Sequence, residues 1–198
     1  MMRTPGLLAA DQAHERAEDV FFGQVVMIWA RWAVIAAAAV LFFWSTADVN
    51  LLTARVLLLV CLMAVNFYLH GRYLIERPAN RALILFATFA DIGLISAAVF
   101  LWGGFQSQLF ALLYPVVFAL ALVFPPRTTA VVTFLALCAY AGALAAGNLD
   151  WVGDLQQVKI LLVRLLTLVA IGGLGTYYWR IQRRRRRQAL GLAADIPR

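Results

Sequence analysis

Six long apolar segments, separated by short turn sequences, constrain the fold of this 198-residue chain more than any other feature. A helix needs about 20 apolar residues to cross roughly 30 Å of hydrocarbon at about 1.5 Å per residue. Helices are the expected elements because a helix satisfies its own backbone hydrogen bonds in lipid. The segments that meet or approach this length are residues 26–46, 51–70, 82–102, 109–124, 129–147 and 158–179. The sequence therefore predicts an all-α, polytopic transmembrane bundle of six spans.

The composition agrees with a membrane protein of one domain. The chain is 64% hydrophobic and only 14% charged, whereas a soluble domain is about 45–50% apolar and about 25% charged. We expect a six-helix domain at residues 26–182, after a cytoplasmic or interfacial segment at 1–25 and before a basic cytoplasmic tail at 183–198. Residues 11–25 mix acidic and aromatic side chains, which fits either a helix lying along the membrane surface or a disordered lead-in.

The basic residues predict the orientation, since cytoplasmic loops of membrane proteins carry an excess of Lys and Arg. With six spans, thirteen basic residues fall in the N-terminal segment, the second and fourth loops and the tail, while the opposite loops hold only Lys159. Both termini are therefore expected in the cytoplasm. This topology explains the net charge of +7 without nucleic acid as a partner. The terminal arginine run is expected to contact anionic lipids; it comprises Arg183, Arg184, Arg185, Arg186 and Arg187.

Polar residues within the spans are candidate functional residues, because burying charge in a bilayer is costly. Asp91 lies near the middle of the third span, about 15 Å deep, and Arg164 lies about 9 Å from the outer end of the sixth. We expect these two residues to form a buried pair. Alternatives are a hydrogen bond between Asp91 and Ser96 or Tyr114, and a protonatable or ligand-contacting carboxylate. Asn66, in the second span, is the third intramembrane polar residue.

Other unusual residues of the spans receive structural interpretations. Arg31 and Arg55 lie close enough to the membrane faces to extend their guanidinium groups into the headgroup region. Cys61 and Cys138 lie in apolar runs without C-x-x-C spacing, so we expect small buried side chains rather than a metal or redox site. Pro115 is expected to kink the fourth span.

The sixth span has a face of small residues. The face comprises Gly172, Gly173, Gly175 and Thr176, with Thr176 four residues after Gly172. Such faces allow two helices to approach closely. The contact is expected either within the bundle, which is the favoured interpretation, or with a partner subunit.

Several residues along the chain occur in the same order as in a known family of membrane domains. Arg31 opens the first span, Asn66 falls late in the second, and Asp91 lies midway through the third. The outer loop that follows reads Gly-Gly-Phe-Gln-Ser-Gln-Leu-Phe over residues 103–110, with Tyr114 beyond it. This order resembles the six-helix N-terminal membrane input domain of bacterial sensor histidine kinases, especially the redox-sensing class.

The resemblance implies a location in the bacterial inner membrane and a quinone, or a lipid, as the candidate ligand of this loop. In the family the loop looks like Gly-Gly-x-x-Asn/Ser-Pro-Phe and is associated with quinone binding in redox-sensing members. Here Gln108 stands in place of the proline, and Leu109 moves the phenylalanine by one position. The implied binding residues are Gly103, Gly104, Ser107, Phe110 and Tyr114.

The rest of a sensor kinase has no counterpart in this sequence. In such kinases the last span leads into a dimerising helix with a phosphoacceptor histidine and then an ATP-binding domain, but this sequence has no histidine after His70. We therefore expect no enzymatic activity and favour a non-catalytic accessory subunit that packs against other membrane proteins of a larger complex. The alternative is a sensor input domain, quinone- or redox-responsive, whose output module is separate or lies further along the gene. A transporter is a distant third interpretation.

Overall fold

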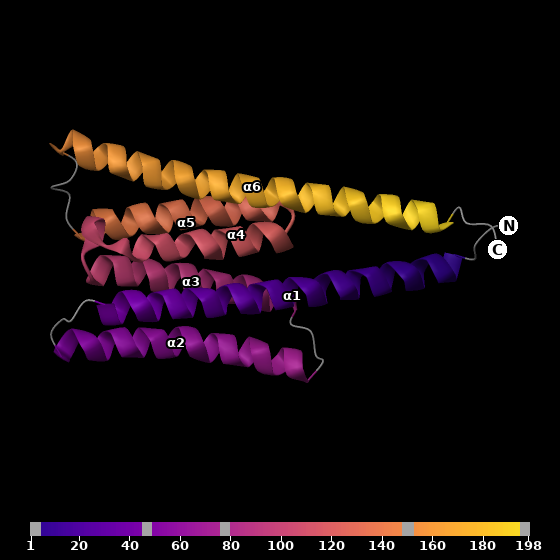
Figure 1. The fold of residues 1–198 in the computed structure, drawn as a ribbon, viewed down its shortest axis with the longest axis horizontal. Helices are drawn as coiled ribbons and strands as arrows, with labels where there is room; N and C mark the ends of the chain where they lie inside the picture. Colours follow the sequence, from indigo (N-terminus) through magenta and orange to yellow (C-terminus); the bar gives the residue numbers. More distant parts are fainter. Residues whose placement is uncertain (1–4, 45–48, 76–79, 148–152, 195–198) are drawn as a thin grey trace. The chain divides into compact units, whose positions relative to one another are not determined.

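The computed structural model describes residues 5–44, 49–75, 80–147 and 153–194, and within these ranges the chain is built of helices without strands (Figure 1). Two short 3-10 helices, η1 and η2, lie between the third and fourth α-helices. The elements are α1 Pro5–Trp44, α2 Val49–Leu74, α3 Arg81–Leu101, η1 Gly104–Gln106, η2 Gln108–Leu112, α4 Leu113–Val123, α5 Pro126–Gly147 and α6 Leu155–Ala194. The all-α fold predicted from the sequence is confirmed. The expected end of the first span, at residue 46, lies outside the described residues.

Five helices are long and apolar enough to cross a membrane. Their candidate spans are Gly23–Trp44, Leu52–Leu74, Arg81–Leu101, Pro126–Gly147 and Leu155–Arg185. Each span covers at least about 30 Å at about 1.5 Å per residue, which matches the hydrocarbon core of a bilayer. These helices are those of a multi-pass membrane protein.

The segment expected as the fourth span is divided between η2 and α4. Helix α4 has only 11 residues, and the shorter apolar stretch that includes η2 covers Gln108–Val123. Pro115 lies in the first turn of α4, where the backbone has no α-helical partner for an N–H group in any case. Pro115 is therefore the third residue of α4, just after the 3-10 helix ends, and not an interior residue of a helix of spanning length as expected.

The first and last helices are longer than a membrane span. Helix α1 is 40 residues long and starts at Pro5, so residues 11–25 are helical and continuous with the first span. Helix α6 is also 40 residues long and passes through the arginine run to Ala194. The boundaries expected at residues 25 and 182 thus fall inside continuous helices.

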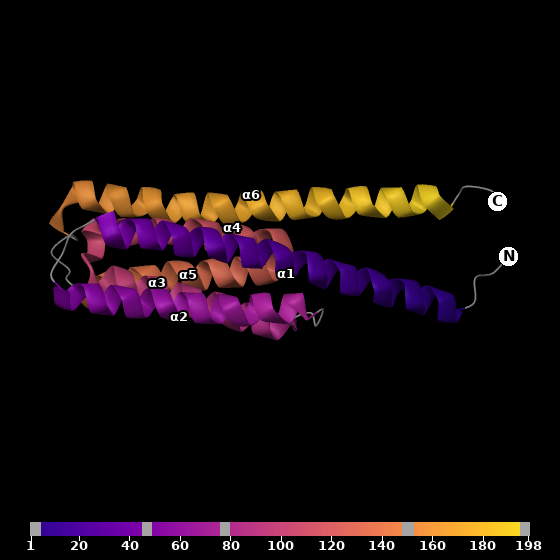
Figure 2. The same cartoon turned by 60° about the horizontal axis from the view of Figure 1, so that its bottom comes forward.

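The chain forms two compact units, Met1–Asp91 and Ile92–Arg198, and the division falls inside α3. In the first unit, α1 and α2 run antiparallel, side by side (Figure 2). The Trp32 and Phe67 rings meet edge to face with centroids 5.1 Å apart, and the Gln24 side-chain amide donates to the Leu69 carbonyl at 3.1 Å. These contacts fix the register of the two helices.

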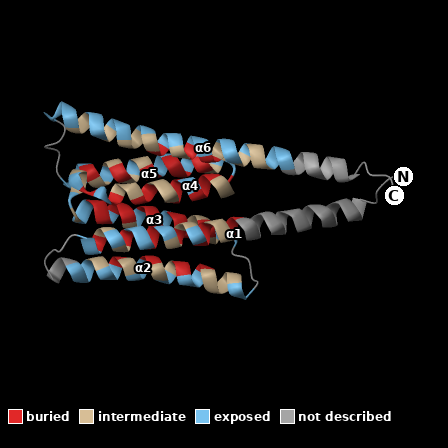
Figure 3. Ribbon diagram, viewed as in Figure 1, coloured by how far each residue is buried: buried red, intermediate tan, exposed pale blue. Residues whose placement is uncertain are grey.

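In the second unit, α6 packs along both α4 and α5. Buried residues concentrate on α4, whereas α6 carries mostly exposed ones (Figure 3). Cys61 of α2 and Cys138 of α5 are exposed, so the expectation that both are buried is wrong. Each lies on an outward face of its helix, where lipid accommodates a weakly polar thiol as well as a protein core does.

Candidate functional site

A buried ion pair occupies the first unit. Arg31 Nη2 of α1 lies 2.6 Å from Asp91 Oδ1 of α3 and also donates to the Ala87 carbonyl at 3.2 Å. Arg31 is 3% exposed and Asp91 is 2% exposed. At this distance in a low-dielectric interior, the attraction between the two charges offsets the free-energy cost of removing them from water. Either charge alone would be strongly destabilising there.

The expected partners of Asp91 and Arg31 are therefore corrected. Asp91 pairs with Arg31, while Arg164 binds Tyr140 and Phe105, so the expected Asp91–Arg164 pair is wrong. Arg31 is buried rather than extended toward a membrane face. The helical periodicity of α1 explains this, because the buried residues that share its face at spacings of three and four are Met27, Ile28, Val34, Ile35 and Ala38.

Asn66 adds a third polar side chain to the first unit. It is 0% exposed and shares the buried face of α2 with Leu62 and Leu69. Among the described residues, both of its amide atoms lack a hydrogen-bond partner, as do Arg31 Nη1 and Asp91 Oδ2. Because buried polar atoms are usually paired, the first unit retains unused hydrogen-bonding capacity around its ion pair.

A second polar cluster surrounds Arg164 in the other unit. Arg164 Nη1 donates to the Tyr140 hydroxyl and to the Phe105 carbonyl, each at 2.8 Å. The guanidinium carbon lies 3.9 Å from the centroid of the Phe110 ring and 4.9 Å from that of Phe105. Cation–π contact with two rings stabilises a charge that is only partly buried.

The loop around Arg164 is shaped by two glycines and a serine. Gly103 has φ +107° and Gly104 has φ +50°, a left-handed backbone that favours glycine. Ser107 then starts η2, because its hydroxyl accepts from the Leu109 N–H at 3.2 Å. The resulting turn places the Phe105 carbonyl and the Phe110 ring against Arg164.

The residues that the resemblance implied as a binding set thus divide into those that shape the turn and those that lie in or next to the cluster around Arg164. Gly103, Gly104 and Ser107 shape the turn, whereas Phe110 contacts Arg164 directly. The Phe110 ring stands at 90° to Tyr114, with centroids 5.6 Å apart, and lies 5.9 Å from the ring of Tyr140. We name the group Phe105, Phe110, Tyr114, Tyr140 and Arg164 the Arg164 cluster.

Sequence reasoning did not identify Tyr140. It lies in the middle of α5 and is 2% exposed, and a buried tyrosine hydroxyl usually has a partner. This need for a partner could have indicated Tyr140 from the sequence. The partner in the structure is Arg164.

The small-residue face of α6 packs within its own unit. An ideal Cβ atom at Gly172 would lie 3.0 Å from Thr133 Oγ1, and one at Gly175 would lie 2.5 Å from Ala121 Cβ. Gly173 has no atom within 4 Å of such a position, and Thr176 is half-buried. The close contact therefore uses Gly172 and Gly175, while Gly173 faces outward.

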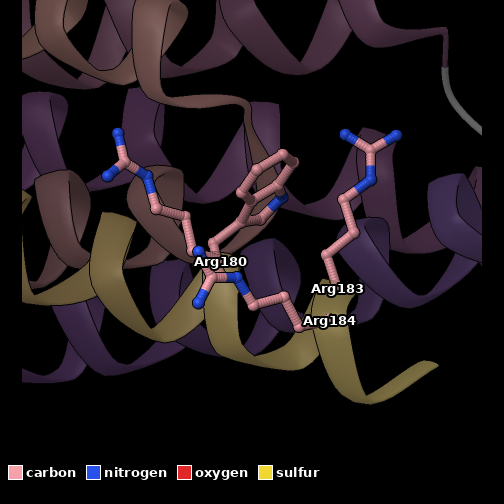
Figure 4. Close-up of a pocket in the computed structure, with 4 residues that line it drawn as sticks. Arg180, Arg183 and Arg184 are labelled. Carbon is pink, nitrogen blue, oxygen red and sulfur yellow. The ribbon is translucent and has the colours of Figure 1, made fainter. Parts of the chain in front are cut away.

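The arginine run is described by its side chains only as far as Arg185; the side chains of Arg186 and Arg187 lie outside the described part. The Arg183 guanidinium carbon stands 4.9 Å from the centroid of the Trp179 ring. Arg180, Arg183 and Arg184 line a shallow hollow together with Trp179 (Figure 4). We name these four residues the Trp179 hollow.

The chemistry of both clusters is that of cations held by carboxylate, carbonyl, hydroxyl and aromatic groups. Among the described side chains, no group of three or more His, Cys, Asp or Glu residues is placed to hold a metal ion. The chain matches no model of a protein family, no curated protein and no solved structure.

Proposed function

We propose that this chain is the membrane-embedded input module of a signalling system. A ligand that binds at the Arg164 cluster would bias the position of α6, whose far end carries the arginine run. The observation that carries the proposal is that both features belong to one continuous helix, Leu155–Ala194. About 30 Å of helix separates Arg164 from Arg184, so a displacement at one end reaches the other without passing through a loop.

The Arg164 cluster supports a quinone as the ligand. Arg164 Nη1 donates the two hydrogen bonds to Tyr140 and Phe105, and a guanidinium group has five N–H donors in all. A quinone carbonyl is a hydrogen-bond acceptor, and the quinone ring is a flat apolar partner for Phe110 and Tyr114. A cationic donor beside two aromatic rings that meet edge to face therefore supports a quinone as the ligand.

The packing of α6 favours transmission of a movement. Gly172 and Gly175 bring the α6 backbone directly onto side chains of α4 and α5. Small residues let helix backbones approach closely, so a displacement of α6 acts directly on α4 and α5. We propose that ligand binding selects between two positions of α6 along this contact, by its differential affinity for them.

The proposal is tested by a distance measurement within the second unit. In a background with alanine at positions 61 and 138, spin labels are attached at Arg127→Cys of α5 and Arg185→Cys of α6, both exposed. A ubiquinone analogue should shift the distance distribution between the labels, and Arg164→Gln should abolish the shift. If the analogue binds but leaves the distance unchanged, or shifts it equally in Arg164→Gln, the proposal fails.

A second candidate is the accessory subunit of a larger membrane complex. One observation favours it: Gly142 of α5 and Gly173 of α6 are exposed, with nothing within 4 Å of an ideal Cβ atom. Outward-facing glycines in a span let a partner helix approach. Gly173→Leu should then remove a co-purifying membrane protein without lowering the thermal stability of the chain. Purification as a monomer or a homodimer alone argues against this candidate.

Both candidates use the same topology, which we propose as six spans with cytoplasmic termini in a bacterial inner membrane. The segment Gln108–Val123 supports the sixth crossing: its five 3-10 residues and 11 α-helical residues rise about 2.0 and 1.5 Å each, about 27 Å together. The proposed topology is tested by introducing single cysteines at residues 127 and 159 and labelling them in intact cells with a membrane-impermeant reagent. Residue 159 should react and residue 127 should not.

A further inference from the structure

We propose that the Trp179 hollow is a binding site for the headgroup of a lipid that carries two phosphate groups, of the cardiolipin class. This goes beyond general contact between the arginine run and anionic lipid, because it assigns the site to four particular residues and excludes a neighbouring arginine. It is also independent of any ligand at Arg164.

The geometry of α6 gathers these four residues on one side. At about 100° per residue, Trp179, Arg183, Arg180 and Arg184 follow one another within about 140° of the helix circumference. Arg185 lies about 100° beyond Arg184, outside this arc. Figure 4 shows Arg180, Arg183 and Arg184 rising from one stretch of α6 around the hollow.

The size and level of the hollow suit a lipid headgroup. Its volume is about 210 Å³, below the range of about 300–1,000 Å³ typical of sites that enclose a whole small molecule. Trp179 ends the apolar part of α6, and tryptophan concentrates at the boundary between hydrocarbon and headgroups. The arginines beyond it therefore stand at the level of lipid phosphates.

The charge of the hollow selects for more than one phosphate. Arg180, Arg183 and Arg184 supply three positive charges, and α6 contains no Asp or Glu to neutralise them. A lipid with one phosphodiester leaves two of these charges unpaired, whereas a two-phosphate lipid leaves one. Arginine also pairs with phosphate oxygens through two parallel N–H donors.

Trp179 gives the hollow its order. The Arg183 guanidinium stacks on the indole at 4.9 Å, which holds a flexible side chain in one position before a ligand arrives. Preorganised side chains lose less conformational freedom on binding, and the indole also offers an apolar surface to the glycerol and the upper part of the acyl chains.

The test compares two arginine variants that differ in charge by the same amount. The full-length protein is delipidated in detergent, and binding of cardiolipin, phosphatidylglycerol and phosphatidylcholine is measured by native mass spectrometry. Cardiolipin should bind most tightly. Arg183→Gln should weaken it about fivefold, and Arg185→Gln less than twofold. Trp179→Leu, which keeps every charge, should weaken it about threefold.

Three results would overturn the proposal. Equal losses in Arg183→Gln and Arg185→Gln would mean that only total charge matters. Equal binding of cardiolipin and phosphatidylglycerol, at the same phosphate concentration, would remove the two-phosphate preference. Displacement of cardiolipin by inorganic pyrophosphate at equal concentration would show that the site takes free phosphates and not a lipid. Circular dichroism of each variant verifies the fold, and the Arg164-dependent distance change is unaffected by any of these outcomes.

Discussion

Arg31 in the first unit and Arg164 in the second both lie inside candidate membrane spans, and they are stabilised in opposite ways. Arg31 meets a carboxylate at 2.6 Å and is 3% exposed. Arg164 meets a carbonyl, a hydroxyl and two aromatic rings, and is only partly buried. The first arrangement carries no net charge, whereas the second keeps a full positive charge among neutral partners.

This difference in net charge favours a structural role for the Arg31–Asp91 pair and a binding role for Arg164. A neutral, fully buried pair attracts no external charge, so its main effect is to join α1 to α3. A cation held by neutral groups still attracts an acceptor oxygen, and its aromatic neighbours supply a surface for an apolar ring. The Arg164 cluster is therefore the better candidate for a ligand site, although Asp91 is a buried carboxylate near the middle of the third expected span.

The largest expected effect comes from breaking the ion pair. Asp91→Leu leaves the Arg31 charge buried and unpaired, which should lower the free energy of unfolding by about 3–5 kcal/mol. The double variant Arg31→Met/Asp91→Leu, with neither charge, should recover most of this loss. Unfolding in mixed micelles measures both. If the double variant is as unstable as the single one, the pair does not act as a coupled unit.

The next effect tests the packing of α6 in the second unit. Gly175→Val places a Cβ atom where the Ala121 side chain lies, 2.5 Å away, and overpacking of this kind costs about 1–3 kcal/mol. It should also move α6 and weaken the quinone binding that we propose at the Arg164 cluster. Gly173→Val, which meets no atom, is the matched control for the change in side-chain size. Equal destabilisation by the two variants would contradict the packing described here.

An effect of similar size is expected from a single hydroxyl group. Tyr140→Phe removes one of the two hydrogen bonds of Arg164 Nη1, at a cost of about 1.5–3 kcal/mol for a hydrogen bond to a charged group. It should also weaken binding of a quinone analogue by about tenfold or less. Tyr73→Phe, in the other unit, serves as the control. Unchanged affinity in Tyr140→Phe would show that the hydroxyl does not orient Arg164.

The smallest effect tests the loop. Gly103→Ala forces a side chain into φ +107° and should cost about 1–2 kcal/mol. Gly104→Asn should be nearly neutral, because φ +50° is a left-handed conformation that asparagine adopts. Both are read from thermal unfolding. The reverse order of the two would contradict the turn geometry.

The sequence predicted the helices well because hydropathy is a local property. Five expected spans fall on long helices, two of which, α1 and α6, extend well beyond the span, and the expected fourth span is divided between η2 and α4. Helix ends at Trp44 and Leu74 likewise lie close to the expected ends.

The pairing of charges was not predictable in the same way, because it depends on which helices are neighbours. Measured from the starts of their candidate spans at Gly23 and Arg81, Arg31 and Asp91 lie about 12 and 15 Å along their helices. That difference of about 3 Å is smaller than the one between Asp91 and Arg164. A comparison of how far each residue lies from the same membrane face would have favoured Arg31 as the partner of Asp91. The spacing of the apolar residues of α1, which places Arg31 on the buried face, would also have favoured it.

The continuity of α6 has a geometric consequence for its two ends. Because no loop interrupts the helix between Arg164 and Arg183, the 19 intervening steps fix the angle between the two side chains at about 100° around the axis. A twist of the helix at one end must appear, with the same sign, at the other. Inserting one alanine after Thr167 would leave both sets of residues intact and turn them about 100° out of phase. The chain would then keep the residues of the Arg164 cluster and of the Trp179 hollow, but only one of the two sets could still face its present neighbours.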